Sequence, residues 1–437
     1  MTELKKDLSL YGLIMVAIGA SIGSGIFTTP STIAKTLMSP SLILGVWVIG
    51  GFITITGALT YGELGGLFPR AGGIYAYLRE AYGDLVAFLY GWTVLMVTNT
   101  GSIAFLVLTF AKYVNFFVPL GYYGIQIVAI SAILLVTVIN IFGVKIGEIF
   151  SNLFTGGKLM GIGVLILAGL WALTKGDAPI YQTPVATAAT AIPNFWSAVG
   201  VALIGVFFSY GGWQHASFLA GETRNAQRVV PIAMIGGALA VIAVYLLTNV
   251  AYLAILTPDQ IASTDTIAAD AMRKITPMGG LFIAFVIAIS TLGTTSIYMM
   301  GVPRIYYAMA EDKIFFKKLA ELHPIYRTPV YAIILQSAWA IVLLLLWGTL
   351  ENLLNYVVFV DWIFFFLASI TIFIFRYRKP DLVRPYRTWG YPITPFIFAT
   401  TILCLIVNTL IEKPIQANAG ILLLASGVPL YFWFKRK

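Results

Sequence analysis

The sequence predicts an all-α integral membrane protein, and three observations carry that prediction. Of the 437 residues, 59% are hydrophobic and only 10% are charged, against about 45–50% and about 25% in ordinary soluble proteins. The apolar residues form runs of the length that a helix needs to cross a bilayer, roughly 20 residues. These runs lack the strict alternation of outer-membrane barrel strands. A water-soluble enzyme, a disordered chain and a disulfide-rich secreted domain are therefore excluded.

Twelve such runs follow one another, separated by charges, prolines and turn residues. They cover about 9–34, 41–66, 84–111, 121–142, 150–173, 194–219, 230–256, 279–303, 329–347, 353–375, 391–410 and 417–434. The first run is not a short signal core followed by a small-residue cleavage site, so we expect it to be retained. We expect residues 1–437 to form a single transmembrane domain.

The distribution of basic residues predicts the orientation in the membrane. With the N-terminus in the cytoplasm, 20 of the 27 Lys and Arg residues fall on the inside and 6 on the outside, while Lys158 lies within a run. This bias favours two cytoplasmic termini, which an even number of crossings requires, and we expect the plasma membrane as the location. The net charge of +9 is thereby explained by topology and does not indicate nucleic-acid binding.

Cysteine and histidine usage predicts neither a disulfide nor a metal site. Cys404 is the only cysteine, so it forms no internal disulfide, and we expect it to pack as a small apolar residue. His215 and His323 have no neighbouring ligands in the sequence, and we interpret them as surface or interfacial residues. We expect no metal and no cofactor.

Glycine clusters interrupt the first and the sixth run. Residues 19–27 read GASIGSGIF, and residues 207–213 read FFSYGGW. A helix in lipid satisfies its backbone groups internally, so a glycine cluster in mid-span needs a reason. Matching interruptions in the two halves of a chain indicate a transporter binding site. Close helix contacts between small residues, or simple kinks, are the alternative.

Two broken helices offer what the two ends of an amino acid require. The N–H groups at the start of a half-helix suit a carboxylate, and the carbonyl groups at the end of a half-helix suit an ammonium. Backbone groups alone can therefore hold a zwitterion, without a buried Arg or Asp to neutralise it.

The motifs resemble those of the amino acid–polyamine–organocation superfamily, and within it the L-type amino acid transporter branch. Residues 23–27, followed by Pro30, are similar to the first-span signature of the superfamily. The other matching segments are 69–75 with Tyr82 and Gly83, 208–213 with 221–225 and Pro231, and 384–387. The resemblance covers essentially the whole chain, and it is closest to bacterial homologues of the alanine–serine–cysteine exchanger type.

The resemblance implies a LeuT-type fold, substrate bound at the breaks, and alternating access. In that fold, residues of about 9–173 and about 194–375 form a five-plus-five inverted repeat with broken first and sixth helices, and two helices at about 391–434 are additional. The carboxylate would meet the N–H groups of Ser24, Gly25 and Ile26. The ammonium would meet carbonyl groups near Ser21 and those of Phe208 and Gly211, with the Phe208 ring closing the site from outside.

The resemblance also bears on partners. Animal members of the branch join an accessory glycoprotein through a cysteine in the loop between the third and fourth spans. In this chain the corresponding loop, Lys112 to Gly124, contains no cysteine. We therefore expect no disulfide-linked accessory subunit.

Lys158 lies well inside the fifth run, where a lysine costs about 2.5–3.5 kcal/mol to insert, so a functional role is the default. Its depth limits escape of the head group to the membrane surface. Two roles stay open. The ammonium either replaces the cation of sodium-coupled relatives, which the resemblance favours and which predicts sodium-independent exchange, or it changes protonation during transport, as in a proton symporter.

Other polar groups within the runs have several possible roles. Asp361 in the tenth run could pair with a cation, carry a proton, hold a polar substrate group or pin a helix contact. We expect Glu63 to join an inner gate or to pair with a loop. The hydroxyl groups of the eighth run are expected beside the cation region or at helix contacts: Ser290, Thr291, Thr294, Thr295 and Ser296.

These observations favour a sodium-independent exchanger of small neutral L-amino acids such as alanine, serine and cysteine. Ser21, Ser24 and Thr100 leave only modest room for a substrate side chain. A proton-coupled amino acid symporter on the same fold is the alternative. An intramembrane enzyme would need a catalytic dyad or metal cluster within the runs, and a channel would need a selectivity filter; the sequence shows neither.

Overall fold

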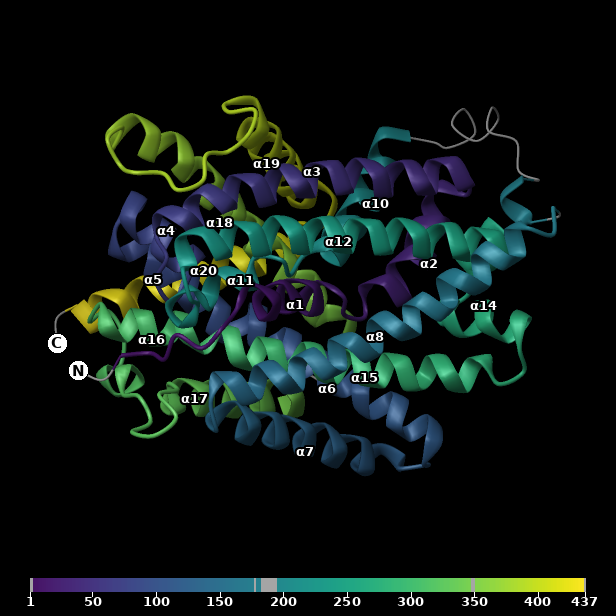
Figure 1. Ribbon diagram of the computed structural model, residues 1–437, viewed down its shortest axis with the longest axis horizontal. Coiled ribbons are helices and arrows are strands. Elements are labelled where there is room, and N and C mark those ends of the chain that lie inside the picture. The colour runs from purple at the N-terminus through teal and green to yellow at the C-terminus, as the bar shows by residue number, and fades with distance from the viewer. Residues whose placement is uncertain (1–2, 177, 182–194, 347–349, 436–437) are drawn as a thin grey trace.

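The computed structural model of the chain describes residues 3–176, 178–181, 195–346 and 350–435. Within these ranges the regular secondary structure is helical, apart from one isolated parallel β-bridge between Leu8 and Thr223. Most long helices run along the long axis of the molecule, and both chain termini lie at the same end (left in Figure 1). Residue 194, at the start of the sixth predicted run, and residue 347, at the end of the ninth, lie outside the described residues.

The first five predicted runs correspond to helices, and the first run is split. The elements are α1 (Leu10–Ser21), α2 (Gly25–Leu37), α3 (Pro40–Leu67), α4 (Ile74–Tyr82), α5 (Asp84–Thr93), a π-helical turn (Val94–Thr98), α6 (Asn99–Phe117), α7 (Gly121–Ile141) and α8 (Val144–Leu173). Local signals fix several ends: Ser9 caps α1 through Gly12 N (3.2 Å), Pro40 begins α3, and Gly83 separates α4 from α5 at φ 87°.

The remaining runs follow with a second split. After a 3₁₀ turn (Pro179–Tyr181), the elements are α10 (Phe195–Tyr210), α11 (His215–Phe218), a 3₁₀ turn (Ala220–Glu222), α12 (Ala226–Ile255), α13 (Pro258–Ser263), α14 (Ile267–Ile275), α15 (Gly279–Gly301), α16 (Pro303–Glu311), a 3₁₀ turn (Lys317–Ala320), α17 (Val330–Leu346), α18 (Leu350–Arg378), α19 (Ile393–Glu412) and α20 (Pro414–Lys435). The sixth run is therefore helical only as far as Tyr210 before it is interrupted.

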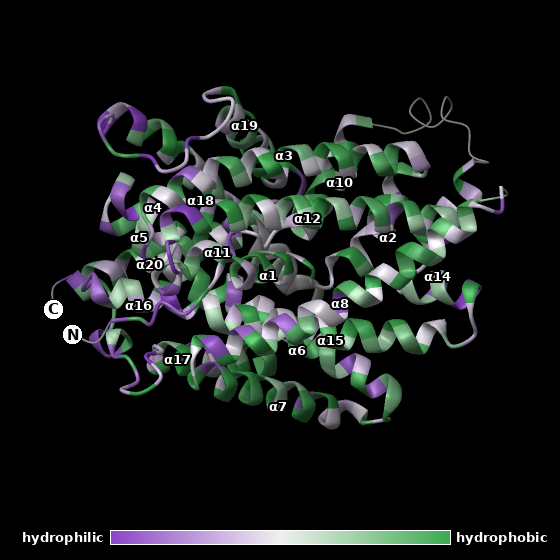
Figure 2. Ribbon diagram, viewed as in Figure 1, coloured by the Kyte–Doolittle hydropathy of each residue, from purple (hydrophilic) through white to green (hydrophobic). Residues whose placement is uncertain are grey.

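The helices have the length and apolarity of membrane spans. In the described part of the chain, nine helices are long and apolar enough to cross a bilayer, and α1 with α2 makes a tenth candidate that is bent by 40°. Two shorter apolar helices, α10 and α17, match the sixth and ninth runs. Hydrophobic residues dominate the helices along their length, while hydrophilic residues gather near the end that carries the termini (Figure 2). A multi-pass membrane protein accounts for this pattern.

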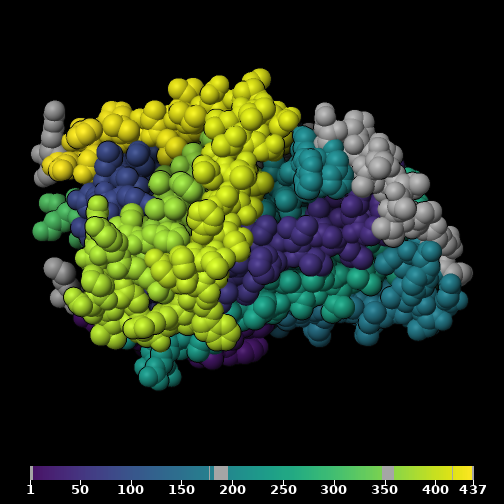
Figure 3. All heavy atoms as spheres, turned by 90° about the horizontal axis from the view of Figure 1, so that it is seen from above, coloured from purple at the N-terminus to yellow at the C-terminus, as the bar shows by residue number. Residues whose placement is uncertain are grey.

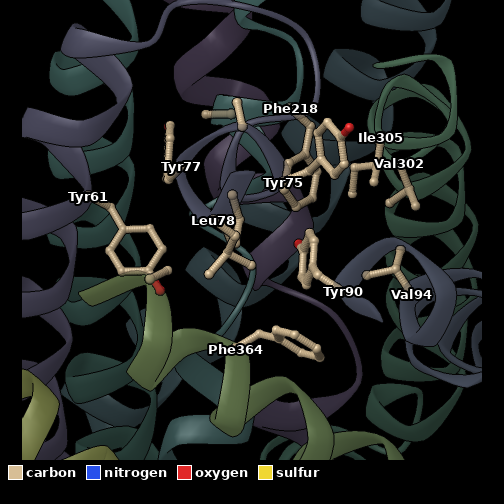
Figure 4. Close-up of a cluster of buried hydrophobic side chains, with 14 of the residues drawn as sticks. Tyr61, Tyr75, Tyr77, Leu78, Tyr90, Val94, Phe218, Val302, Ile305 and Phe364 are labelled. Atoms are coloured by element: carbon tan, nitrogen blue, oxygen red, sulfur yellow. The ribbon is translucent and has the colours of Figure 1, made fainter. Parts of the chain in front are cut away.

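The helices form a central bundle with an outer layer. α1 lies in the middle, against α8, α12 and α15. The last two helices, α19 and α20, pack against α3, α5 and α18 and cover one face of the molecule (Figure 3). A cluster of buried aromatic and aliphatic side chains fills the space between α3, α4, α5, α16 and α18, and it includes Tyr61, Tyr77, Tyr90 and Phe364 (Figure 4).

Close contact between α1 and α8 depends on two glycines. A Cβ atom added at Gly12 would overlap the Glu148 side chain, and one added at Gly19 would overlap Thr155. Gly12 and Gly19 are seven residues apart on α1, and Glu148 and Thr155 are seven residues apart on α8. Seven residues make about two helical turns. α1 therefore packs closely against α8 at these two positions. The contact at Gly19 lies near the C-terminal end of α1, just before the break.

Candidate functional site

The first break separates α1 from α2 in the middle of the bundle. Residues 22–24 are not helical, and the chain changes direction by 40° there. The amides of Gly25 and Ile26 begin α2, so no carbonyl lies one turn before them to accept their hydrogen bonds. The break therefore leaves backbone donors on one side, while on the other side the carbonyls of Gly19, Ser21 and Ile22 accept hydrogen bonds from side chains of other helices; Ser21 O accepts from Tyr245 (2.9 Å).

Lys158 caps the carbonyl side of this break. Its side chain is fully buried, and its Nζ donates to Gly19 O (3.0 Å), Ile22 O (2.6 Å) and Thr294 Oγ1 (2.8 Å). These partners use all three ammonium donors. The head group thus points at the end of α1 rather than along α8 toward a membrane surface.

Two hydroxyl groups of α15 complete this polar cluster. Thr294 Oγ1 lies 2.9 Å from Gly19 O, and Ser290 donates to Ile22 O (3.2 Å). The other three hydroxyl groups predicted in this region are buried without contacting Lys158 in the described structure; Thr291 and Thr295 bond back to α15, and Ser296 accepts from Ser151 (3.2 Å). Only part of the hydroxyl set therefore surrounds the ammonium, and the rest serves helix contacts.

The second break touches the first. α10 ends at Tyr210, and Gly212 takes a φ of +120°, a conformation that side-chain-bearing residues rarely adopt. A Cβ atom at Gly212 would lie 2.5 Å from Ser21 N and 2.6 Å from Ala20 C. Glycine is required here both by the backbone conformation and by the contact with the first broken helix.

The half-helices also meet on the other side of the breaks. Ser209 Oγ donates to Thr29 Oγ1 (2.9 Å), and a Cβ atom at Gly25 would lie 2.9 Å from Ser209 Oγ and 3.1 Å from Ser209 Cα. α2 and α10 therefore pack closely, with Gly25 of α2 against Ser209 of α10. The two glycine clusters, about 190 residues apart in the sequence, form one junction.

A cavity of about 120 Å³ lies at this junction. Most of the predicted site residues line it: Ser21, Ser24, Gly25, Phe208, Gly211 and Asp361. Two do not. Ile26 is fully buried behind the first turn of α2, where its carbonyl accepts from Tyr252 (3.3 Å), and Lys158 lies behind the break. The structure thus separates the predicted residues into a cavity wall and a second layer that supports it.

His215 lines the cavity, although the sequence interpretation placed it at a surface or an interface. It is not a surface residue: its ring is 3% exposed and lines the cavity. Its Nδ1 lies 3.1 Å from Gly212 O, its Nε2 lies 3.3 Å from Asn99 Oδ1, and its ring stacks on Tyr298 at 4.3 Å. Gly212 O and Asn99 Oδ1 both accept hydrogen bonds, so each ring nitrogen of His215 faces an acceptor oxygen. The sequence feature that could have placed His215 at the site is its position, three residues after Gly212.

The polar wall on α6 also differs from the expectation. Thr100 does not line the cavity in the described structure; its hydroxyl is buried and donates to Leu95 O (2.6 Å). Asn99 and Ser102 line the cavity instead. The π-helical turn at Val94–Thr98 explains the change, because one extra residue in a turn rotates every later side chain about the helix axis.

Ion pairs gather at the end of the bundle that carries the termini. Glu222 and Arg304 form a bidentate pair (2.7 and 2.9 Å) with both side chains 1% exposed. Leu8 of the N-terminal segment bonds to the same loop, through Glu222 O (3.0 Å) and Arg224 N (3.1 Å). The start of the chain is thereby fastened to the segment that follows the second break.

Further pairs tie neighbouring loops to this end. Glu63 binds Arg376 (2.7 Å) and Arg384 (3.2 Å) and accepts from Thr388 N (2.7 Å), so the predicted pairing of Glu63 with a loop is confirmed. Tyr75 of α4 donates to Asp312 (2.8 Å). Burial raises the pKa of Tyr75, and the Asp312 carboxylate raises it further. Tyr75 is therefore a fixed donor at any physiological pH.

The described residues contain no candidate metal site, and Cys404 forms no disulfide. No three His, Cys, Asp or Glu side chains within the described ranges are placed to share a metal ion. His323 lies partly buried in a loop, where its Nδ1 accepts from Ile325 N and Tyr326 N (3.2 Å each). Cys404 does not pack inside the bundle as predicted; it is exposed on α19, on the outer layer of the fold.

Comparison with known proteins identifies the family. The family model described as "Amino acid permease" matches residues 8–433. The chain belongs to the amino acid permease family. The resemblance to the amino acid–polyamine–organocation superfamily is thereby confirmed, and the members that the chain resembles are transporters rather than enzymes.

Relatives of this permease include bacterial and animal transporters. The serine/threonine exchanger SteT of Bacillus subtilis (strain 168) is 33% identical over 99% of this chain and 98% of its own. The mouse b(0,+)-type amino acid transporter 1 is 28% identical over 99% of this chain and 88% of its own. The human large neutral amino acids transporter small subunit 2 is 29% identical, covering 98% and 80%.

Proposed function

We propose that this permease is a sodium-independent exchanger of small neutral L-amino acids that works by alternating access. One observation carries the proposal: the Lys158 ammonium bonds the carbonyls of Gly19 and Ile22 at the break and the Thr294 hydroxyl. Carbonyls freed by a broken helix, together with hydroxyl groups, are the ligands that transporters of this architecture use to coordinate Na⁺. A fixed ammonium among these oxygens leaves no need for a coupling sodium ion.

Backbone recognition at the two breaks supports an amino acid substrate. The carboxylate binds the N–H groups of Ser24, Gly25 and Ile26 at the start of α2. The ammonium binds carbonyls on the opposite side, near Ser21 and at Phe208 and Gly211. The Phe208 ring covers the bound substrate, and the cavity of about 120 Å³ favours a short side chain. Because the zwitterion has no net charge, neutral amino acids fit without a charged partner for the head group.

Exchange is preferred over proton symport because Lys158 is held by three hydrogen bonds. Loss of its proton would leave two carbonyl oxygens at the break with one donor fewer, which is costly inside a protein. A proton-coupled symporter remains the second candidate, since Asp361 faces the cavity and could carry a proton. The bacterial relative that is 33% identical to this chain is an exchanger, which also favours exchange.

The proposed membrane arrangement has twelve crossings and a LeuT-type, five-plus-five inverted repeat within one domain. The ten long candidates, counting α1 with α2 as one, together with the shorter α10 and α17, would supply the crossings. Residues of about 9–173 and about 194–375 would be the repeats, and α19 and α20 the additional helices. The excess of Lys and Arg on one side favours two cytoplasmic termini in the plasma membrane. No disulfide-linked accessory subunit is required.

Transport by the purified protein in liposomes tests the proposal. Liposomes loaded with unlabelled alanine or serine should take up labelled substrate faster than empty ones, without sodium and irrespective of a pH gradient. Uptake that demands a pH gradient would favour the symporter instead. Uptake that requires sodium would refute the assignment of Lys158 to the cation position.

A further inference from the structure

We infer that Asp361 makes this cavity selective for amino acids whose side chain donates a hydrogen bond, over apolar side chains of the same length. This inference rests on the proposed function, because it assigns the contact of the substrate side chain within the same site. The main-chain groups of the substrate are taken up by the two breaks. A group on α18 that faces the same cavity is therefore within reach of the side chain alone.

The position of Asp361 is fixed by packing around α18. Asp361 lines the cavity together with Trp362 and Phe365. Tyr61 donates to the carbonyl of Phe365 (3.0 Å), and the ring of Phe364 packs on Tyr90 at 5.2 Å (Figure 4). These contacts come from two other helices, α3 and α5, so they set the rotation of α18. The carboxylate is held toward the cavity by its helix and does not depend on a flexible loop.

No cationic side chain neutralises this carboxylate. Within the described residues, neither Lys, Arg nor His forms an ion pair with Asp361, and no other Asp, Glu, Lys or Arg lines the cavity. Lys158 has all three donors committed at the first break. The ring nitrogens of His215 are committed to Gly212 O and the Asn99 amide.

Asp361 consequently has spare capacity to accept hydrogen bonds. A carboxylate offers about four acceptor positions, and the Thr98 hydroxyl occupies one of them. The remaining positions face a small cavity whose walls also include Phe105, Leu106 and Phe208. In such surroundings an unpaired acceptor strongly favours a ligand that supplies a donor over one that supplies a methyl group.

The small size of the cavity favours a donor on a short side chain. We expect a hydroxyl or an amino group one carbon from Cα to suit a cavity of about 120 Å³ better than a long cationic chain. The inferred preference is therefore serine over 2-aminobutyrate, and 2,3-diaminopropionate over 2-aminobutyrate. The side chains of these three compounds have the same length and differ only in the terminal group.

A binding experiment with this series tests the inference. Affinities of the purified full-length protein for 2-aminobutyrate, serine and 2,3-diaminopropionate are measured by ligand-induced thermal shift at one pH. We expect serine and 2,3-diaminopropionate to bind about tenfold more tightly than 2-aminobutyrate, because each donates a hydrogen bond to the Asp361 carboxyl group and 2-aminobutyrate donates none. In Asp361→Ala the preference should fall to about twofold or less, with 2-aminobutyrate affinity retained, and Asp361→Asn should lie between. Asp265→Asn, at a carboxylate that is 95% exposed, should leave the preference unchanged.

The outcomes separate this inference from the proposed function. Equal affinities for 2-aminobutyrate and serine in the unaltered protein would overturn the inference while leaving amino acid exchange intact, and this comparison needs no variant to fold. Loss of 2-aminobutyrate binding in a folded Asp361→Ala protein would also overturn it, because Asp361 would then serve the site as a whole. Failure of all amino acids to bind the unaltered protein would instead refute the proposed function.

Discussion

The ammonium nitrogen of Lys158 lies 2.6 Å from the carbonyl oxygen of Ile22, at the point where the first helix breaks. The lysine belongs to α8 and the carbonyl to the segment between α1 and α2, 136 residues apart in the sequence. One buried charge therefore stabilises the non-helical backbone beside the cavity. The shape of the substrate site depends on a residue that does not line it.

Lys158→Ala should leave a folded protein that transports amino acids about tenfold more slowly or worse. The substitution removes three hydrogen bonds from a charged donor, each worth about 1.5–3 kcal/mol, and leaves two carbonyl oxygens of the break with fewer donors. Initial rates of exchange in liposomes measure the effect. Lys112→Ala, at an exposed lysine of α6, is the matched control and should transport normally. Normal exchange by Lys158→Ala would remove this lysine from the mechanism.

Gly212→Ala should destabilise the protein and weaken substrate binding. The new methyl group would meet Ser21 N at 2.5 Å, and a φ of +120° is itself costly for alanine, by about 1–3 kcal/mol. Thermal unfolding and a thermal-shift titration with serine measure the two effects. Gly236→Ala on α12, where a Cβ has open space, should change stability by no more than about 1 kcal/mol. Equal behaviour of the two variants would contradict the contact between the breaks.

Gly25→Leu should abolish substrate binding while leaving insertion into the membrane intact. The added side chain would overlap Ser209 and cover the first amides of α2, which the proposed site uses for the carboxylate. Binding of radiolabelled serine to purified protein checks this, with monodisperse elution in detergent as the test of folding. Retained affinity would show that the amides at this break do not hold the substrate.

Breaking the buried pair between Glu222 and Arg304 should be far more costly than breaking a surface pair. Arg304→Ala leaves a carboxylate that is 1% exposed without its partner, which typically costs about 3–5 kcal/mol. Arg273→Ala, which breaks a pair with Asp270 whose two side chains are 49% and 33% exposed, should cost about 1 kcal/mol or less. Thermal unfolding of both variants in one detergent makes the comparison. Equal melting temperatures would mean that the buried pair does not stabilise this end of the bundle.

The positions of both breaks could be predicted from the sequence, because a glycine cluster in an apolar run has few structural explanations. Lys158 could likewise be singled out, because an isolated charge in such a run is conspicuous. Its partners could not be predicted. They belong to α1 and α15, and only the packing of distant segments brings Gly19, Ile22 and Thr294 around one ammonium.

The start of α8 shows how local composition misled the sequence interpretation. The fifth run was expected from residue 150, because Lys145 and Glu148 precede it and charged residues usually mark a loop. The helix begins at Val144, and Glu148 is 2% exposed, packed against Gly12 and paired with Lys145 at 2.7 Å. A charge can lie on a buried helix face when a glycine opposite makes room and a partner neutralises it.

Prediction of the cavity wall failed where side-chain direction decides the outcome. Thr100 was expected beside the substrate, but in the structure Asn99 and Ser102, which follow the π-helical turn, line the cavity instead. His215 was interpreted as a surface residue because a histidine within an apolar run has no sequence partner; its partner Tyr298 comes from α15. The rotation of α6 and the stacking on Tyr298 could not be predicted, because both depend on how distant helices pack.

The fit of Gly12 and Gly19 against Glu148 and Thr155 has a consequence for the speed of transport. Because these contacts leave no room for a Cβ at either glycine, we expect any tilt of α1 during transport to move α8 with it. α8 presents Leu153 and Met160 outward, each 72% exposed, on a face that we expect to contact acyl chains. Such a tilt would displace lipid, and we expect turnover to slow as the bilayer is made more viscous.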